Sequence, residues 1–279
     1  MAETIHPGYL GLVDITGVGR VRFTDSNITA RQEINAPDII MGDYDHDAYV
    51  FGKIEVGGTV SGPVTETFGA AGGLWDWATS RTGTCKELAE AGLTVYYYCE
   101  KSRTFSGMKV NSVNFSCAAG DIAQFSIDLM GKSAAAWGSG TTSYEDAEKL
   151  ITWDKVSVAV GGGGPDAGAL TNVSYSNFDF TISNNLEPVY SLSQDNLFPV
   201  QVVEGLRTIT GSLSVYNAPE VDGVESWDDY TAADVATLAF NIGDLAVSFR
   251  CQFHRVEPAA SVGPVVSTVG FTGVTHQSF

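Results

Sequence analysis

The chain contains similar stretches of sequence in two places, and this repetition limits the folds that it can adopt. Five short blocks recur in the same order further along the chain, four offset by 152 or 153 residues and the last by 142. The matched blocks are 28–34 with 180–186, 56–61 with 209–214, 75–76 with 227–228, 92–99 with 244–251, and 127–131 with 269–273. Conserved block order at a nearly fixed spacing is typical of a duplicated structural unit. We therefore expect two tandem domains, 1–150 and 151–279.

The composition favours strands over helices in both domains. The chain has 31 glycines and only 17% charged residues, and residues 125–129 alternate between apolar and polar side chains, as strands do. We expect a mostly β fold, with each domain a β-sandwich or partial barrel carrying one short helix. Apolar residues spaced three and four apart place the expected helices at 85–91 and 232–240.

The net charge of −18 opposes direct nucleic-acid binding. Such binding depends on Lys and Arg displacing counterions from phosphates, so this surface is expected to let DNA pass without adhering. Simple solubility and adaptation to high salt are alternative explanations of the charge. The cysteines Cys85, Cys99, Cys117 and Cys251 have no zinc-ligand spacing, and we expect buried free thiols, with a Cys99–Cys117 bridge as an alternative.

The sequence contains no recognisable catalytic or cofactor-binding motif. Asp43, Asp45 and Asp47 have the spacing of a calcium loop, but Ala48 and Ile54 stand where an EF-hand needs Gly and Glu. These acids are therefore interpreted as a loop tip. We expect no enzyme activity and no cofactor, and the N-terminus lacks the pattern of a signal peptide. No apolar run is long enough for a membrane span.

One long stretch does resemble a known family. NFDFTISNNLEPVYSLSQDNLFPVQVVEGLRTITGSLSVY is similar to phage tail tube proteins, in which a strand leads into a long arm and a strand of the form G-x-R-x-x-x-G-x-hydrophobic-x-hydrophobic returns. Gly205, Arg207, Gly211, Leu213 and Val215 occupy that pattern here. The first domain has a looser version, FGKIEVGGTV, with a lysine in place of the arginine. Residues 105–131 resemble the closing hairpin of a tube domain.

The resemblance implies an architecture in which six tube domains join their sheets edge to edge and form a shared inner β-barrel. The returning strands, represented by Val56, Thr59, Val60, Arg207, Ile209 and Leu213, would belong to that barrel. The arms would contact the neighbouring ring through Asp43, Asp45, Asp47, Val189, Tyr190, Asp195 and Phe198. The lumen of such tubes is typically negative, which agrees with the net charge.

Two domains in one chain depart from the usual single-domain subunit and imply three chains in each ring. The implied protein is a major tail tube subunit of a siphovirus-like phage or archaeal virus, assembled in the host cytoplasm. Its implied partners are copies of itself, the tail terminator, tail-tip or baseplate proteins, and the tape measure protein and viral DNA in the lumen. The alternatives are a baseplate hub ring with two tube-like domains and, from another class, a carbohydrate-binding β-sandwich adhesin.

Overall fold

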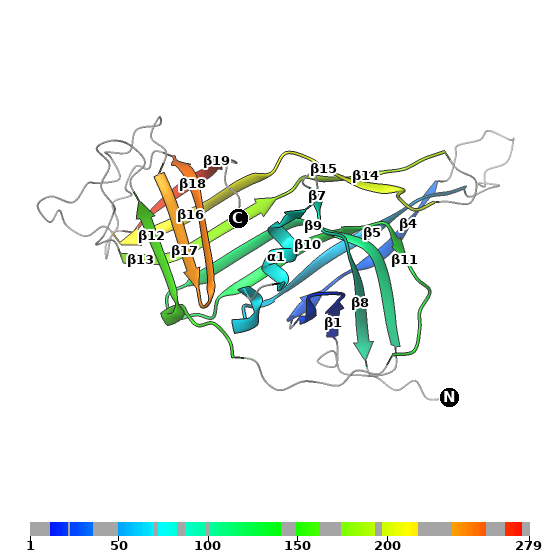
Figure 1. Ribbon diagram of the computed structural model, residues 1–279, viewed down its shortest axis with the longest axis horizontal. Helices are drawn as coiled ribbons and strands as arrows, with labels where there is room; N and C mark the ends of the chain where they lie inside the picture. The colour runs from blue at the N-terminus through cyan, green and yellow to red at the C-terminus, as the bar shows by residue number, and fades with distance from the viewer. Residues whose placement is uncertain are drawn as a thin grey trace, which may run out of the picture.

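The computed structural model is dominated by one long antiparallel sheet whose two ends fold over into second layers (Figure 1). It describes residues 12–21, 23–35, 50–69, 72–82, 87–98, 101–140, 149–161, 174–192, 197–216, 236–254 and 266–274. In these described ranges the sheet has fifteen strands and does not close into a barrel. The mostly β fold predicted from composition is therefore confirmed.

The first half of the sheet has the strand order β1-β8-β9-β10-β5, with β3 and β4 on the far side of β5. Two short strands, β2 and β11, pair with β1 and β9 at the margins. The bounds of these strands are β1 Leu12–Ile15, β2 Gly19–Val21, β3 Asp25–Ser26, β4 Thr29–Asn35, β5 Val50–Pro63, β8 Ala91–Tyr98, β9 Lys101–Ala118, β10 Gln124–Gly131 and β11 Ser133–Ala134.

The second half has the order β12-β17-β18-β19-β16-β13. Its strands are β12 Val156–Gly161, β13 Ser174–Ser183, β16 Thr208–Tyr216, β17 Ala236–Ile242, β18 Leu245–Phe253 and β19 Val266–Val274. The two halves join where β13 pairs antiparallel with β9, from Asn177 opposite Ala118 to Ser183 opposite Ser112. Each strand of the first order thus has a counterpart at the same place in the second.

The cross-strand register matches between the halves as well. Leu129 lies opposite Gly58 in the first half, and Phe271 lies opposite Gly211 in the second. These four positions are related by the offsets of 142 and 153 residues at which the sequence blocks match. A register slip of one residue would turn every side chain to the other face, so agreement at this level constrains the packing of both halves.

One sequence match does not follow the sheet order. Residues 92–99 lie mainly in β8, whereas 244–251 lie mainly in β18, the strand that occupies the position of β9. The strand at the position of β8 is β17. Similar alternation in neighbouring strands explains why the two segments look alike without being counterparts.

Both expected helices are wrong where the structure describes them. Glu87–Leu88 forms the short strand β7, which pairs with β6 Arg81–Thr82, and the segment from Ala236 onward is strand β17. In β17 the buried residues alternate along the chain, so period two outweighs the weak three-and-four spacing. The α-helix in the described part of the chain is instead α1, Leu74–Thr79.

Helix α1 packs against the sheet through its aromatic side chains. Trp75 meets the ring of Phe115 with the ring centroids 5.5 Å apart, and the Trp77 indole donates to the Ala89 carbonyl over 3.1 Å. Two short 3-10 helices are also present: Glu66–Gly69 lies between β5 and α1, and Trp153–Lys155 directly precedes β12. The helix therefore covers the middle of the core-facing sheet surface (Figure 1).

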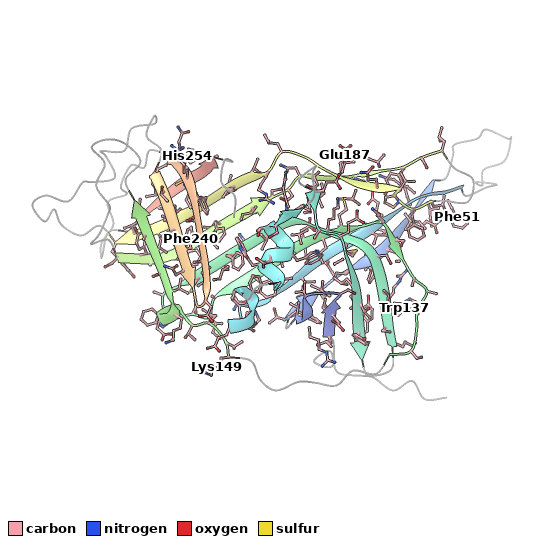
Figure 2. The ribbon with its side chains drawn as sticks, in the orientation of Figure 1. Phe51, Trp137, Lys149, Glu187, Phe240 and His254 are labelled. Atoms are coloured by element: carbon pink, nitrogen blue, oxygen red, sulfur yellow. The ribbon has the colours of Figure 1, made fainter. Side chains whose placement is uncertain are left out.

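One large hydrophobic core runs through both halves. Phe115 of β9 stacks on Phe180 of β13 with centroids 5.3 Å apart, and Phe180 stacks on Phe240 of β17 at 4.7 Å. Figure 2 shows Phe240 within the layered part of the second half. Cys117 and Cys251 are buried free thiols in this core, so a Cys99–Cys117 bridge is not formed.

The opposite face of the central sheet carries small polar side chains. Along β10 the buried residues Phe125, Ile127 and Leu129 alternate with more accessible polar ones, as predicted from the sequence. The polar set on neighbouring strands is Thr59, Ser61, Ser112, Asn114, Ser116, Ser126, Asp128, Asp179, Thr181, Thr210 and Ser212. This surface is rich in hydroxyl and amide groups and, in this set, has carboxylates but no Lys or Arg.

Candidate assembly surfaces

A projecting arm leaves the second half and lies along the first half of the same chain. Its base is the two-stranded hairpin of β14 Leu186–Val189 and β15 Gln201–Glu204. Further along, the Ile54 amide of β5 donates to the Leu197 carbonyl over 2.8 Å, and the Tyr190 hydroxyl donates to the Ile54 carbonyl over 3.2 Å. The arm, whose two strands form a separate sheet, thus lies along β5 (Figure 1).

The arm exposes an unusual number of large apolar side chains. Leu192 is fully exposed, and Leu206 is 77% exposed. The other members of this set are Val189, Leu197, Val200 and Val203. A soluble monomer rarely concentrates apolar side chains on one projecting element, so the arm is a candidate contact surface.

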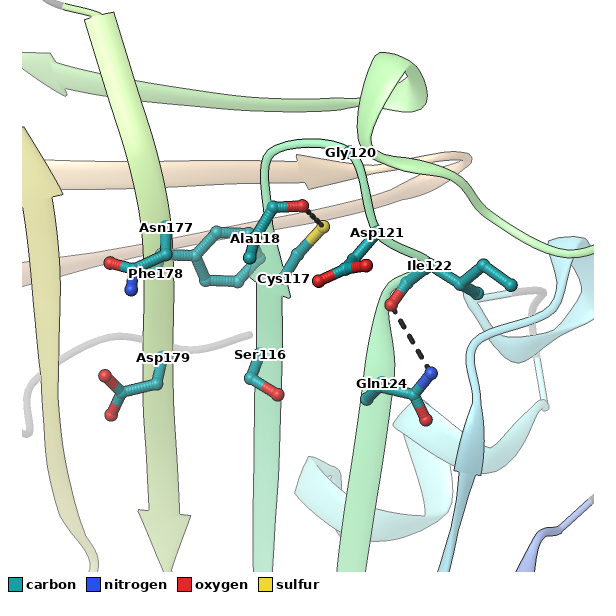
Figure 3. Close-up of a pocket in the computed structure, with 10 residues that line it drawn as sticks. All are labelled: Ser116, Cys117, Ala118, Gly120, Asp121, Ile122, Gln124, Asn177, Phe178 and Asp179. Atoms are coloured by element: carbon teal, nitrogen blue, oxygen red, sulfur yellow. Dashed lines mark hydrogen bonds between the residues drawn. The ribbon is translucent and has the colours of Figure 1, made fainter.

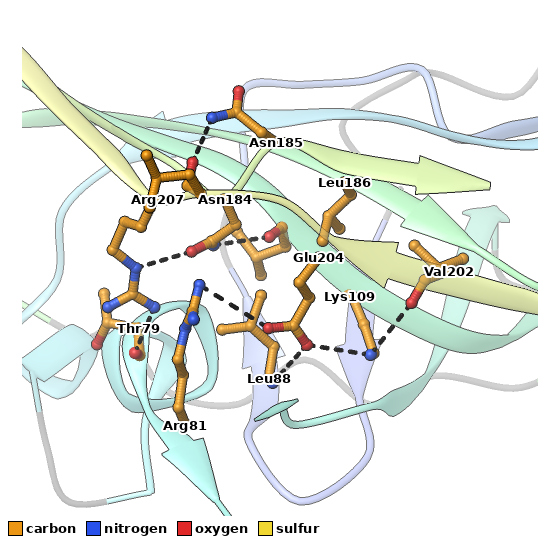
Figure 4. A network of polar contacts seen from close by, with 12 residues as sticks. Thr79, Arg81, Leu88, Lys109, Asn184, Asn185, Leu186, Val202, Glu204 and Arg207 are labelled. Atoms are coloured by element: carbon orange, nitrogen blue, oxygen red, sulfur yellow. Dashed lines mark hydrogen bonds and ion pairs between the residues drawn. The ribbon is translucent and has the colours of Figure 1, made fainter. Parts of the chain in front are cut away.

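An ion pair fixes the root of the arm to the first half (Figure 4). Lys109 of β9, with a side chain only 4% exposed, donates from Nζ to Glu204 Oε1 over 3.1 Å and to the Val202 carbonyl over 3.3 Å. The Leu88 amide donates to the same Glu204 oxygen over 2.6 Å. Beside these groups, Leu88, Leu186 and Val202 form a small apolar cluster. Residues far apart in sequence therefore determine where the arm begins.

Arg207 forms the second half of this root (Figure 4). Its Nε donates to Asn184 Oδ1 over 2.9 Å, and its Nη2 donates to the Thr79 carbonyl at the end of α1 over 2.8 Å. Burial lowers the pKa of the Arg207 guanidinium to about 10, with repulsion from Arg81 adding to this and Glu204 opposing it. The group stays cationic at neutral pH and ties the arm to the helix.

Asn184 is fully buried and links the arm to the long strand. Its amide nitrogen donates to the Val110 carbonyl over 2.9 Å, while its backbone N–H donates to the Asn111 carbonyl over 2.7 Å. Arg81 lies at the edge of this network, with Nη2 3.9 Å from Glu204 and buried Nε and Nη2 atoms that have no hydrogen-bond acceptor. Most of the buried polar atoms at the root are thus satisfied, as a fixed attachment requires.

Three of the residues predicted for the arm, Val189, Tyr190 and Phe198, lie in the described part of the chain. Val189 ends β14, Tyr190 follows it, and Phe198 packs partly buried against the main core. The Lys53 ammonium lies 5.7 Å from the centre of the Tyr190 ring. Asp43, Asp45, Asp47 and Asp195 lie outside the described residues.

The residues predicted for the returning strands occupy β5, β16 and the turn before β16. Val56, Val60, Ile209 and Leu213 are buried in the core, and Thr59 lies on the polar face, where its hydroxyl contacts Asn27 Oδ1 at 3.1 Å. Arg207 precedes β16 and belongs to the arm root. Lys53, its proposed equivalent, is instead exposed and pairs with Glu55 over 2.7 Å.

Sequence reasoning missed Lys109, Glu204 and the contribution of α1 to the arm root. A signal for Lys109 was present, because a lysine between Met108 and Val110 interrupts a run of apolar residues in β9. A buried lysine needs an acidic partner. Nothing local in the sequence identifies that partner, which lies 95 residues further along the chain.

A shallow depression lies at the ends of β9, β10 and β13 (Figure 3). Ser116, Gln124 and Asp179 line it, and Gln124 donates to the Ile122 carbonyl over 3.4 Å. Within the described ranges, no group of three His, Cys, Asp or Glu side chains is placed to hold a metal ion.

A long sheet, a polar face and an arm rich in exposed apolar residues define the class of proteins that assemble through their strands and projections. The chain belongs to the phage tail tube protein family, whose model matches residues 4–273. It is therefore a structural protein of the phage tail. No curated protein sequence matches the chain. Among the described residues, no helix is long and apolar enough to cross a membrane.

Proposed function

We propose that this protein is the major tail tube subunit of a siphovirus-like phage, that three chains form each ring, and that stacked rings make the channel for genome delivery. In this proposal each chain supplies two tube domains, 1–150 and 151–279, so that a ring of three has pseudo-sixfold symmetry. Its partners are further copies of itself, the tail terminator and tail-tip proteins at the ends, and the tape measure protein and then DNA inside.

The observation that carries the proposal is the junction between β9 and β13. Two halves with the same strand order meet edge to edge through this pairing. Repeating the junction between chains requires a second edge of the same kind. The described part of β4, the counterpart of β13, pairs only with β5, so its outer edge is open to another strand. An open edge of this kind is a liability in a monomer and a connector in an assembly.

A junction that joins unlike edges is heterologous, and such contacts build rings when the rotation closes and filaments when it does not. Six similar junctions, three within chains and three between them, would close a ring of three chains. The polar face of the central sheet suits the channel wall. The polar set named above contains hydroxyls, amides and carboxylates and no Lys or Arg, and the net charge of −18 repels a nucleic acid.

The arm is the proposed contact between successive rings. Leu192 and Leu206 leave their apolar surface in water in the single chain, and burying them on a neighbouring ring would stabilise the stack. The residues assigned to this contact are Val189, Tyr190, Asp195 and Phe198, with Asp43, Asp45 and Asp47 on the arm of the first domain.

Electron microscopy of the purified protein at high concentration tests the proposal. We expect hollow tubes of constant diameter in negative stain. A protein that stays monomeric at every salt concentration would contradict both the tube and any ring. A baseplate hub ring is the second candidate, since two linked units per chain also suit a ring of three; single rings that never stack would favour it.

A further inference from the structure

Two apolar side chains near the end of β4 and the start of β5 are exposed, although they lie opposite each other on these paired strands. Ile34 of β4 lies opposite Phe51 of β5, and they are 60% and 61% exposed. Cross-strand pairs of this kind normally stabilise a sheet by packing under a second layer. In the single chain this pair has no such cover.

The matching pair in the second half is covered. Leu186 lies opposite Glu204, and the offsets of 152 and 153 residues from Ile34 and Phe51 are those of the sequence repeat. Leu186 is only 8% exposed because it packs against Leu88 and Val202, and Glu204 pairs with Lys109. Leu88 and Lys109 belong to the other half of the chain, so cover for one arm root comes from the neighbouring unit.

The strand register also identifies the residue of the second half that corresponds to Lys109. Lys109 of β9 lies opposite Met130 of β10. Met130 corresponds to Thr272 at the offset of 142 residues, and Thr272 lies opposite Gln252 of β18, so Gln252 is the counterpart of Lys109. Lys109 is 3% exposed under the arm, whereas Gln252 is exposed. Figure 2 shows Phe51 at one end of the molecule and His254, two residues after Gln252, towards the other. The uncovered pair and its matching surface therefore lie at opposite ends of one chain.

We propose that Ile34 and Phe51 dock on the Gln252 side of β18 in a second copy of this chain. The inference rests on the proposed ring, and it specifies the surface and the chemistry of the contact between chains. Inside a chain, the arm contacts the neighbouring unit through the ion pair of Glu204 with Lys109. Between chains, Phe51 takes the place of Glu204 and Gln252 takes the place of Lys109. Phe51 covers the amide side chain of Gln252, and Ile34 loses its exposure in the same step. The two kinds of junction differ in charge, so the ring keeps threefold and not sixfold symmetry.

The test replaces the contact between chains with a copy of the one inside the chain. Phe51→Glu leaves a carboxylate facing Gln252, and we expect the concentration needed for half trimerisation to rise at least about tenfold. Phe51→Glu combined with Gln252→Lys recreates the pair seen at Glu204 and Lys109, and trimerisation should return towards the wild-type level. Trp137→Glu alters a side chain of similar exposure (54%) outside the proposed contact and should leave trimerisation unchanged.

A photo-crosslinking amino acid at position 51 provides a second measurement that does not depend on the charge variants. In the assembled protein we expect crosslinks between chains to the peptide containing Gln252. If the wild type forms trimers but Phe51→Glu trimerises equally well, if Gln252→Lys fails to restore the variant, or if the crosslinks fall elsewhere, this contact is wrong and the ring survives. If the wild type forms no ring, the proposed function itself fails.

Discussion

Lys109 Nζ lies 3.1 Å from Glu204 Oε1, and this ion pair joins the long strand of the first half to the arm of the second. The two side chains are 4% and 11% exposed. Two charges removed from water this far are held by each other and by the Leu88 amide and the Val202 carbonyl. The position of the arm is therefore built into the single chain before any assembly.

Replacing Lys109 with methionine removes one charge and keeps most of the side-chain volume. Because Glu204 is left buried with only the more distant Arg81, 3.9 Å away, as a cation, we expect the free energy of unfolding to fall by about 3 kcal/mol. Lys53→Met is the matched control, since Lys53 pairs with Glu55 in solvent and its loss should lower the free energy of unfolding far less. Urea denaturation of both variants measures the difference, and equal losses would contradict the structural role given to the buried pair.

Gly211 is a position where a side chain does not fit. A Cβ atom there would lie 2.5 Å from Phe271 Cζ and would also meet the Asp179 carbonyl of β13. We expect Gly211→Ala to destabilise the protein by about 1–3 kcal/mol through overpacking between β13 and β19.

Gly161→Ala is the control for that substitution. A Cβ atom at Gly161 would lie 3.6 Å from its nearest neighbour, which is an ordinary contact distance. The free energy of unfolding should therefore change by less than about 0.5 kcal/mol. Thermal unfolding followed by circular dichroism compares the two. A harmless alanine at position 211 would show that β13, β16 and β19 pack less closely than described.

Much of the sheet followed from the sequence because strands are recognisable from period-two alternation. Residues 105–131, which were expected to form a closing hairpin, contain most of β9 and all of β10. The helices were misplaced because short runs of Ala and Leu fit both the helical period of 3.6 residues and the strand period of two. Which of the two forms depends on which side chains the rest of the fold buries. Helix α1 has two tryptophans in six residues, a composition without strong helical preference, and it forms because the core binds those rings.

The arm could be predicted as an element, but its attachment could not. Gly205, Arg207 and Gly211 signalled a returning strand after a long excursion. The contacts of the arm with Thr79, Leu88 and Lys109 depend on how two distant parts of the chain fold together. No local pattern encodes a partner about a hundred residues away, so such pairs become visible only in three dimensions.

The buried thiol of Cys251 gives the stability a dependence on pH. Burial raises the pKa of Cys251 from 9.0 to about 12. The folded state therefore favours the neutral thiol, and this stabilisation is complete below pH 9 and is lost as the pH rises towards 12. We expect the difference in unfolding free energy between the wild type and Cys251→Ala to shrink between pH 8.5 and about pH 11. A difference that stays constant with pH would place the thiol in a more polar environment.

Shortening the arm separates folding from stacking. Residues 190–199 can be replaced by Asn-Gly, because the Val200 amide already donates to the Val189 carbonyl, as across a two-residue turn. This change keeps Val202 and Glu204 at the root. We expect a folded subunit that still forms rings but fails to build long tubes in negative stain. Tubes of normal length would show that another part of the chain makes the contact between stacked rings.

Counting the chains in one ring tests the central claim most directly. Native mass spectrometry of rings at low concentration, together with class averages viewed along the tube axis, gives that number. The matching strand orders of the two halves and the junction between β9 and β13 predict three chains and six similar lobes in each layer. A ring of six chains, or a protein that stays monomeric while remaining folded, would contradict this account.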